Sequence, residues 1–232
     1  MRETDNIGKA LGVTHFLAKK FDLYAFEDEW LETFGQVEKN FKACIYGKPG
    51  HGKTEMCIKL AKYLTRFGTV LYNSFEQGIS KTLQSSIERN NLDEVNGKIT
   101  FGDKITLTQL YSRLARKKSA DIVFIDSRDY MGITAEDYSM LTEQFPRKAF
   151  VIICWQEGSR PAGKAGREIE YMADIKVMVK DFIALPRSRF GGNKPFVIWD
   201  RGTKLEELEN TFTSLEEDAT DAGIQLELEF NK

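Results

Sequence analysis

The feature of the sequence that most constrains the fold is a glycine-rich octapeptide, Gly47-Lys48-Pro49-Gly50-His51-Gly52-Lys53-Thr54. It fills the pattern G-x-x-x-x-G-K-[ST] without a mismatch, and it lies between a predicted buried strand at 41–46 and a predicted helix at 55–66. Glycines let successive backbone N–H groups turn toward a phosphate, and the following helix adds the positive end of its dipole. The octapeptide therefore predicts a nucleotide-binding loop.

The side chains of this loop have separate expected tasks. We expect Lys53 to reach the β- and γ-phosphates and the Thr54 hydroxyl to ligate Mg²⁺. His51 occupies a free position of the pattern and is interpreted as an exposed spacer. The alternative is a glycine-rich turn that matches by chance, and the flanking strand and helix argue against it.

Strands and helices alternate after the loop. Strands are predicted at 69–74, 98–101, 121–126 and 149–155, and helices at 79–90, 107–117 and 135–144. This βαβ repetition predicts a mainly parallel sheet covered on both faces. From residue 174 onward, closely spaced strands with a turn at 191–193 predict an antiparallel hairpin region that extends the sheet. We expect three parts: an approach segment without a core of its own (1–40), an α/β core (41–203) and an acidic tail (204–232).

Composition limits the compartment and the partners. Cys44, Cys57 and Cys154 lie in apolar settings at no metal-ligand spacing, so we expect buried reduced thiols. No apolar run approaches the roughly 18 residues that span a bilayer, and no signal pattern is apparent, so a cytoplasmic protein without a membrane partner is expected. Residues 41–203 hold 26 Lys and Arg against 18 Asp and Glu. That surplus favours a polyanionic partner, although a mixed solvated surface gives a milder version of the same imbalance.

Two carboxylates follow predicted strands and are candidates for phosphoryl chemistry. Asp126 ends the apolar strand at 122–125, which is typical of a Walker B carboxylate that holds Mg²⁺. Glu76 follows the strand at 69–74 and is expected to face the nucleotide crevice, where a carboxylate can orient and deprotonate water. An ordinary strand-terminal Asp and an exposed Glu are the competing interpretations.

These motifs together resemble the RecA-like ATPase core, in particular the cores of RadA/Sms-type recombination proteins and DnaB-type replicative helicases. The resemblance covers about residues 25–202 and includes the Glu76 segment, Phe124-Ile125-Asp126-Ser127 and Trp155-Gln156. Residues 167–175 are similar to the I-E-x-x-A-D stretch of that family, and Arg187-Ser188-Arg189-Phe190-Gly191 is similar to its K-x-R-[FN]-G segment. The resemblance implies a three-layer RecA-like P-loop NTPase fold, with ATP and Mg²⁺ as cofactors.

The same resemblance implies roles for four side chains. Glu76 would be the catalytic glutamate, Gln156 would sense the γ-phosphate, and Arg187 with Arg189 would reach the ATP of a neighbouring subunit. A ring or filament of identical subunits follows from the last role. The sequence departs from the family by having Arg187 where Lys is usual, which keeps the charge but not the geometry, and by lacking the companion domains. Two surface arginines on a hairpin are the alternative.

Two further segments are candidate partner sites. Residues 157–167 are basic, glycine-rich and poor in apolar residues, so we expect a mobile loop in which Arg160, Lys164 and Arg167 contact DNA phosphates, or else a simple flexible connection. Near the C-terminus, Gln225, Leu226, Leu228 and Phe230 resemble the Q-L-x-L-x-[LF] peptide that binds the bacterial sliding clamp. A last edge strand is the plainer interpretation of that peptide.

The sequence therefore predicts a Mg²⁺-dependent ATPase that acts on DNA, most readily single-stranded, in recombination, repair or replication. The alternative is a nucleotide-dependent interaction switch with a protein partner, similar to KaiC-like relatives. A metabolic kinase is disfavoured because no acceptor-binding lid is apparent.

Overall fold

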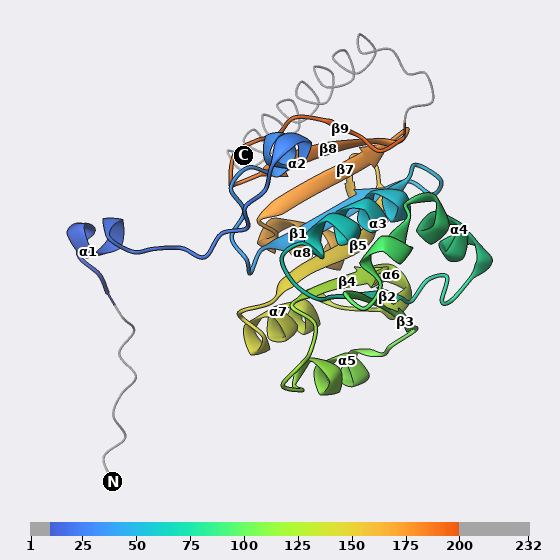
Figure 1. The fold of residues 1–232 in the computed structure, drawn as a ribbon, viewed down its shortest axis with the longest axis horizontal. Helices are drawn as coiled ribbons and strands as arrows, with labels where there is room; N and C mark the ends of the chain where they lie inside the picture. The colour runs from blue at the N-terminus through green and yellow to red at the C-terminus, as the bar shows by residue number, and fades with distance from the viewer. Residues whose placement is uncertain (1–9, 200–232) are drawn as a thin grey trace, which may run out of the picture.

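Short runs rich in Val, Ile and Phe form a nine-stranded sheet, which Figure 1 shows at the centre of the molecule. The computed structural model describes residues 10–199. The order across the sheet is β3-β2-β4-β5-β1-β7-β8-β9, and β6 pairs with β5. The strands are β1 (Lys42–Gly47), β2 (Val70–Ser74), β3 (Ile99–Asp103), β4 (Ile122–Asp126), β5 (Ala149–Glu157), β6 (Arg160–Pro161), β7 (Ile175–Lys180), β8 (Ile183–Ser188) and β9 (Phe196–Val197).

The six strands from β3 to β7 in this order run parallel, while β8 and β9 are antiparallel to their neighbours. The described helices are α1 (Val13–Leu17), α2 (Asp28–Phe34), α3 (Lys53–Leu64), α4 (Lys81–Arg89), η1 (Leu92–Val95), α5 (Leu107–Leu114), α6 (Arg128–Met131), α7 (Ala135–Gln144) and α8 (Gly163–Met172). Within residues 10–199, none of these helices is long and apolar enough to cross a bilayer.

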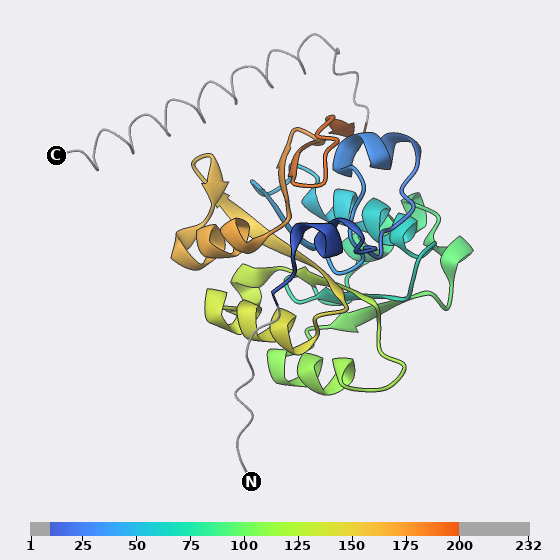
Figure 2. The same ribbon diagram turned by 90° about the vertical axis from the view of Figure 1, so that its left-hand side faces the viewer.

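Alternation along the strands separates two hydrophobic clusters, one on each face of the sheet. In β1, Ala43 and Ile45 pack into the cluster that α2, α3 and α4 cover, whereas Cys44 and Tyr46 pack into the cluster covered by α5, α7 and α8. Figures 1 and 2 show these helices on the two sides of the sheet. The predicted three-layer fold, parallel with an antiparallel C-terminal region, is confirmed.

The second half of the predicted approach segment, residues 1–40, is part of the main core. Tyr24, Phe26, Trp30 and Phe34 are buried and belong to the cluster on the α3 side of the sheet. The Trp30 ring stacks on Phe196 of β9 with centroids 4.6 Å apart, so this segment fastens the last strand to the sheet. The sequence did not reveal this because the aromatic residues are not arranged at one helical or strand period.

The prediction of a mobile loop at 157–167 is wrong. The chain turns at Gly158 and Ser159, pairs back on β5 as β6, and enters α8 at Gly163. Glu157 pairs with Arg160 in the two-residue ladder, and Gln156 pairs with Pro161. The few apolar residues of this stretch suffice because Pro161 and Gly166 are buried where β6 and α8 meet.

The three cysteines are free and buried, as predicted. Cys44 and Cys154 lie on the neighbouring strands β1 and β5 with their Sγ atoms 3.8 Å apart. This contact and burial raise the pKa of the Cys44 thiol, so the thiol stays protonated and behaves as a small apolar group.

Candidate active site at the carboxyl edge of the sheet

The glycine loop joins the end of β1 to the start of α3, where the octapeptide predicts it. Gly50 and Gly52 have φ values of 80° and 99°, in the left-handed region that glycine adopts without strain. A Cβ atom on Gly47 would lie 2.3 Å from the carbonyl oxygen of Val179, so this close approach requires glycine. Among residues 10–199, no side chain caps the N-terminus of α3, and the first backbone N–H groups of this helix face an open position where an anion can bind.

Lys53 is the first residue of α3, and its ammonium lies over the loop. Its Nζ donates hydrogen bonds to the carbonyl oxygens of Gly47 and Lys48, at 2.7 and 3.0 Å. Burial lowers the pKa of Lys53, while the charges of Glu76 and Asp126 act in the opposite direction. The side chain is therefore partly desolvated beside the two carboxylates that the sequence selects.

Asp126 ends β4 and is the most perturbed carboxyl of the site. Burial raises its pKa to about 6, and the charge of Glu76 adds to this rise. Hydrogen bonds from Tyr72 and Thr54 and the charge of Lys53 act in the opposite direction. The Tyr72 hydroxyl donates to Asp126 Oδ2 at 2.7 Å. The predicted pair of metal ligands, Thr54 and Asp126, is therefore brought together by the fold.

Glu76 lies just beyond the end of β2, in the neighbouring position along the same edge. Ser74 is in register with Asp126, and the backbone N–H of Glu76 donates to the carbonyl oxygen of Asp126 at 2.9 Å. Its side chain is half-buried, and its charge acts on both Lys53 and Asp126. Glu76 therefore meets the positional requirement for a residue that orients water at this edge.

His51 is not the exposed spacer that the pattern suggests. Its Nδ1 accepts a hydrogen bond from the backbone N–H of Asp181 at 3.0 Å, and its carbonyl oxygen accepts from Phe182 N–H at 3.1 Å. Asp181 and Phe182 form the turn between β7 and β8 with φ values of 49° and 63°. The phenyl ring of Phe182 lies against Gly52. A turn far away in sequence thus supports the glycine loop, which a linear motif cannot indicate.

Gln156 lies near the end of β5, one residue after Trp155, which is in register with Gly47. Its Nε2 donates to the carbonyl oxygen of Gly158 at 2.7 Å, so the amide is turned toward its own hairpin. It also contacts the Sδ atom of Met178 at 3.9 Å. The residue is thus close to the site along the strand, and its role as a γ-phosphate sensor stays a prediction.

Arg187 and Arg189 lie near the amino ends of the parallel strands, opposite the carboxyl ends that carry the glycine loop. Arg187 is in register with Lys176 of β7, which is in register with Cys44, three residues before Gly47. That offset is about 10 Å along the strands, and β8 continues away from the loop. Arg189 forms an ion pair with Asp174 at 2.8 Å. These side chains are therefore placed away from the glycine loop of their own chain.

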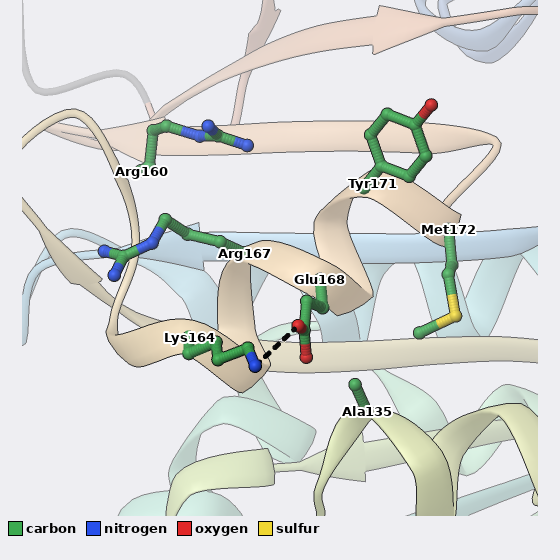
Figure 3. Close-up of a pocket in the computed structure, with 7 residues that line it drawn as sticks. All are labelled: Ala135, Arg160, Lys164, Arg167, Glu168, Tyr171 and Met172. Atoms are coloured by element: carbon green, nitrogen blue, oxygen red, sulfur yellow. Dashed lines mark ion pairs between the residues drawn. The ribbon is translucent and has the colours of Figure 1, made fainter.

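The three predicted DNA-contacting cations line one groove of about 590 Å³ beside α8 (Figure 3). Arg160 binds the buried Glu170 through Nε and Nη2, at 2.9 and 2.7 Å. The other two cations form looser pairs, Lys164 with Glu168 at 3.6 Å and Arg167 with Glu157 at 3.8 Å. Arg160 is thus held in place, while the other two are in weak exposed pairs.

Two residues of the site were missed by sequence reasoning. Tyr72 is read as an ordinary strand residue, yet its hydroxyl contacts Asp126. Asp129 of α6 has a side chain that is 7% exposed, is paired with Arg128, and accepts the backbone N–H of Trp155 at 2.7 Å. An apolar strand that carries a polar ring was a signal for Tyr72. For Asp129, the position three residues after the Walker B-like carboxylate was the available signal.

The chain is similar to one family profile and to solved structures. Residues 43–150 match the profile of the ATPase family associated with various cellular activities (AAA). One solved ATPase domain is similar over 68% of this chain and 80% of that domain, at 16% identity and a TM-score of 0.49. The flagellar accessory protein FlaH from Methanocaldococcus jannaschii is similar over 75% of this chain and 92% of FlaH, at 12% identity and a TM-score of 0.54. No curated protein matches the sequence.

The FlaH likeness concerns the fold, and the profile match spans the loop, β2 and β4 with their carboxylates. The glycine loop, the ammonium of Lys53 and the carboxylate that ends β4 all lie at one edge of the parallel strands. The chain therefore has the RecA-like P-loop fold, and its family match and site geometry support a nucleotide-binding P-loop ATPase.

Proposed function

We propose that the protein hydrolyses ATP with Mg²⁺ at the glycine loop and uses the cycle to act on single-stranded DNA as an oligomer. The observation that carries the first part is the meeting of Lys53, Thr54, Asp126 and Glu76 at one edge of the sheet. The roles at DNA and the likeness to RadA/Sms and DnaB proteins come from the sequence motifs. A cytoplasmic location suits this function.

Each group at the site has its own proposed role in ATP hydrolysis. The backbone N–H groups of the loop and Lys53 bind the phosphates, and Thr54 with Asp126 would hold Mg²⁺, which neutralises phosphate charge when bound. Asp126 would bind the ion as a carboxylate, the form that burial disfavours and the charge of Lys53 favours. Glu76 orients the attacking water and takes its proton. The charge of Asp129 also acts on Lys53, but its carboxylate is occupied by Arg128 and by the backbone of β5.

Completion by a neighbouring subunit is the second part of the proposal. Phosphoryl transfer benefits from an arginine that stabilises charge in the transition state. The position of Arg187 on β8, at the opposite edge of the sheet, supports a role at the nucleotide of another copy of the chain. We expect Arg187→Ala to be inactive alone and to regain part of its activity when mixed with Lys53→Ala. Inactivity of the mixture would refute the exchange of residues between subunits.

A DNA partner is supported by the groove beside α8. Exposed ion pairs contribute at most about 1 kcal/mol, so Lys164 and Arg167 can exchange their carboxylates for DNA phosphates at small cost. The pair between Arg160 and the buried Glu170 instead favours the second candidate, a nucleotide-dependent protein switch, because it assigns Arg160 to the structure of α8. FlaH is named a flagellar accessory protein, which also gives no indication of DNA.

Steady-state ATPase rates with and without single-stranded DNA distinguish the two candidates, with Lys53→Ala as the inactive reference. Stimulation that falls several-fold in Lys164→Ala supports a DNA-dependent ATPase. Lys81→Ala is the matched control, since Lys81 is similarly exposed and forms a comparable loose pair with Glu88 at 3.7 Å. A rate that ignores DNA at low salt, where phosphate contacts are strongest, would favour the protein switch.

The proposed sliding-clamp peptide, Gln225 to Phe230, lies outside the described residues. Its test is deletion of residues 224–232 followed by a clamp-binding measurement. Clamp binding that survives the deletion, or that is absent from the full chain, removes this part of the proposal.

A further inference from the structure

An exposed aromatic pair lies at the same edge of the sheet and has no part in the proposed hydrolysis. Tyr130 of α6 and Trp155 of β5 contact each other edge to face, with centroids 5.3 Å apart and ring planes at 84°. Their exposed fractions are 53% and 41%. We propose that this pair is a stacking platform for the unpaired bases of a single-stranded nucleic acid. The proposal rests on the DNA-dependent function above and names the residues that would select single strands.

Two hydrogen bonds hold the backbone of Trp155 in place. The backbone N–H of Trp155 donates to Asp129 Oδ2 at 2.7 Å, and its carbonyl oxygen accepts from the N–H of Ala162 at 2.8 Å. Asp129 is itself paired with Arg128. Both backbone groups of Trp155 are therefore fixed before any ligand arrives, which reduces the entropy lost on binding.

The edge-to-face geometry of Tyr130 and Trp155 allows a nucleic-acid base to stack on one of the rings. In an edge-to-face pair, the ring that presents its edge keeps both of its faces clear of the partner, and aromatic faces stack on any base irrespective of its identity. Duplex bases already stack on their neighbours, so a platform of this kind distinguishes single strands from duplexes.

Basic side chains come soon after Trp155 in the sequence, at the start of α8. The hydrogen bond from Ala162 places the start of α8 next to the Trp155 backbone, and Lys164 and Arg167 are in the first two turns of that helix. Stacking rings beside phosphate-binding cations are the combination used by proteins that bind single strands without sequence preference.

The platform is also next to the nucleotide site. Trp155 is in register with Gly47 on the adjacent strand, and the charge of Asp129, which holds Trp155, acts on Lys53. The ring position therefore lies beside the strand that leads into the glycine loop.

Tryptophan fluorescence tests the platform directly. Trp199→Phe leaves Trp30 and Trp155, whereas Trp155→Phe leaves Trp30 and Trp199, and Trp155 and Trp199 are equally exposed at 41%. We expect an oligo-dT of about 20 nucleotides to quench Trp199→Phe and not Trp155→Phe. A uridine oligomer reports whether RNA is also accepted. Equal quenching of both variants, or quenching of Trp155 by ATP alone and not by oligo-dT, would overturn the proposal.

Affinity for the labelled oligomer, measured by anisotropy, provides the second test. Trp155→Leu and Tyr130→Leu should each weaken binding about 5- to 160-fold, the loss expected for one stacked base. Tyr130→Phe keeps the ring and should bind like the unaltered protein, and circular dichroism checks that each variant is folded. If the unaltered protein binds and the Leu variants bind equally well, the platform is wrong while DNA binding stands. If the unaltered protein binds no single strand, both proposals fail.

Discussion

Replacing Asp126 by Asn should make the protein more stable and inactive. The pKa of this buried carboxyl is raised from 3.8 to about 6, so the folded protein holds the proton to higher pH than the unfolded chain. The ionised carboxylate therefore costs stability, and this cost grows as the pH rises from about 4 to about 6 and is constant above that. A shift of about 2 units corresponds to about 3 kcal/mol at 1.36 kcal/mol per unit.

Asparagine resembles the neutral carboxyl and can still accept the Tyr72 hydrogen bond. Urea unfolding should therefore show Asp126→Asn to be more stable by about 3 kcal/mol at pH 8, or by about 6 to 12 °C in Tm for a chain of this size. The difference should vanish below about pH 4. Asp93→Asn, at an exposed aspartate, is the control and should change little. If Asp126→Asn is no more stable than the unaltered protein at pH 8, the argument from burial of this charge is refuted.

Three other substitutions test separate contacts. Tyr72→Phe removes the hydroxyl that donates to Asp126, so the acidic limb of kcat/KM should move up by about 1 to 2 pH units; an unmoved limb would show that Asp126 does not control it. Arg160→Ala leaves the buried Glu170 unpaired and should destabilise the fold by about 1 to 3 kcal/mol, a loss that Glu170→Gln in the same chain should partly restore in thermal melts. Trp30→Ala should cost about 3 to 5 kcal/mol in urea unfolding, and a change under 1 kcal/mol would mean that the N-terminal segment does not stabilise the core.

The local parts of the site could be predicted from the sequence because each depends on a short pattern. The glycine loop, Gly47 to Thr54, is recognised from its own residues, the strand before it and the helix after it. The ends of two neighbouring parallel strands bring Glu76 and Asp126 to one edge of the sheet. Parallel register then places them beside each other without further information.

The remaining contacts depend on which distant segments meet, and no local pattern encodes this. His51 is supported by the Asp181–Phe182 turn, more than a hundred residues away. Arg160 was predicted to be mobile because its neighbours are polar, whereas the carboxylate that fixes it, Glu170, lies on the next helix. A count of apolar residues cannot detect an ion pair between an exposed arginine and a buried carboxylate.

The β7–β8 hairpin spans the sheet from the carboxyl ends of the parallel strands to their amino ends. Its turn contacts His51 and Gly52 in the glycine loop, and its far end carries Arg187. The two strands pair over six residues, about 20 Å of antiparallel ladder that resists bending. One continuous ladder therefore joins the glycine loop to the arginine at the opposite end. If copies assemble as proposed, each hairpin would link the glycine loop of one copy to the arginine offered to the next, without a hinge between domains.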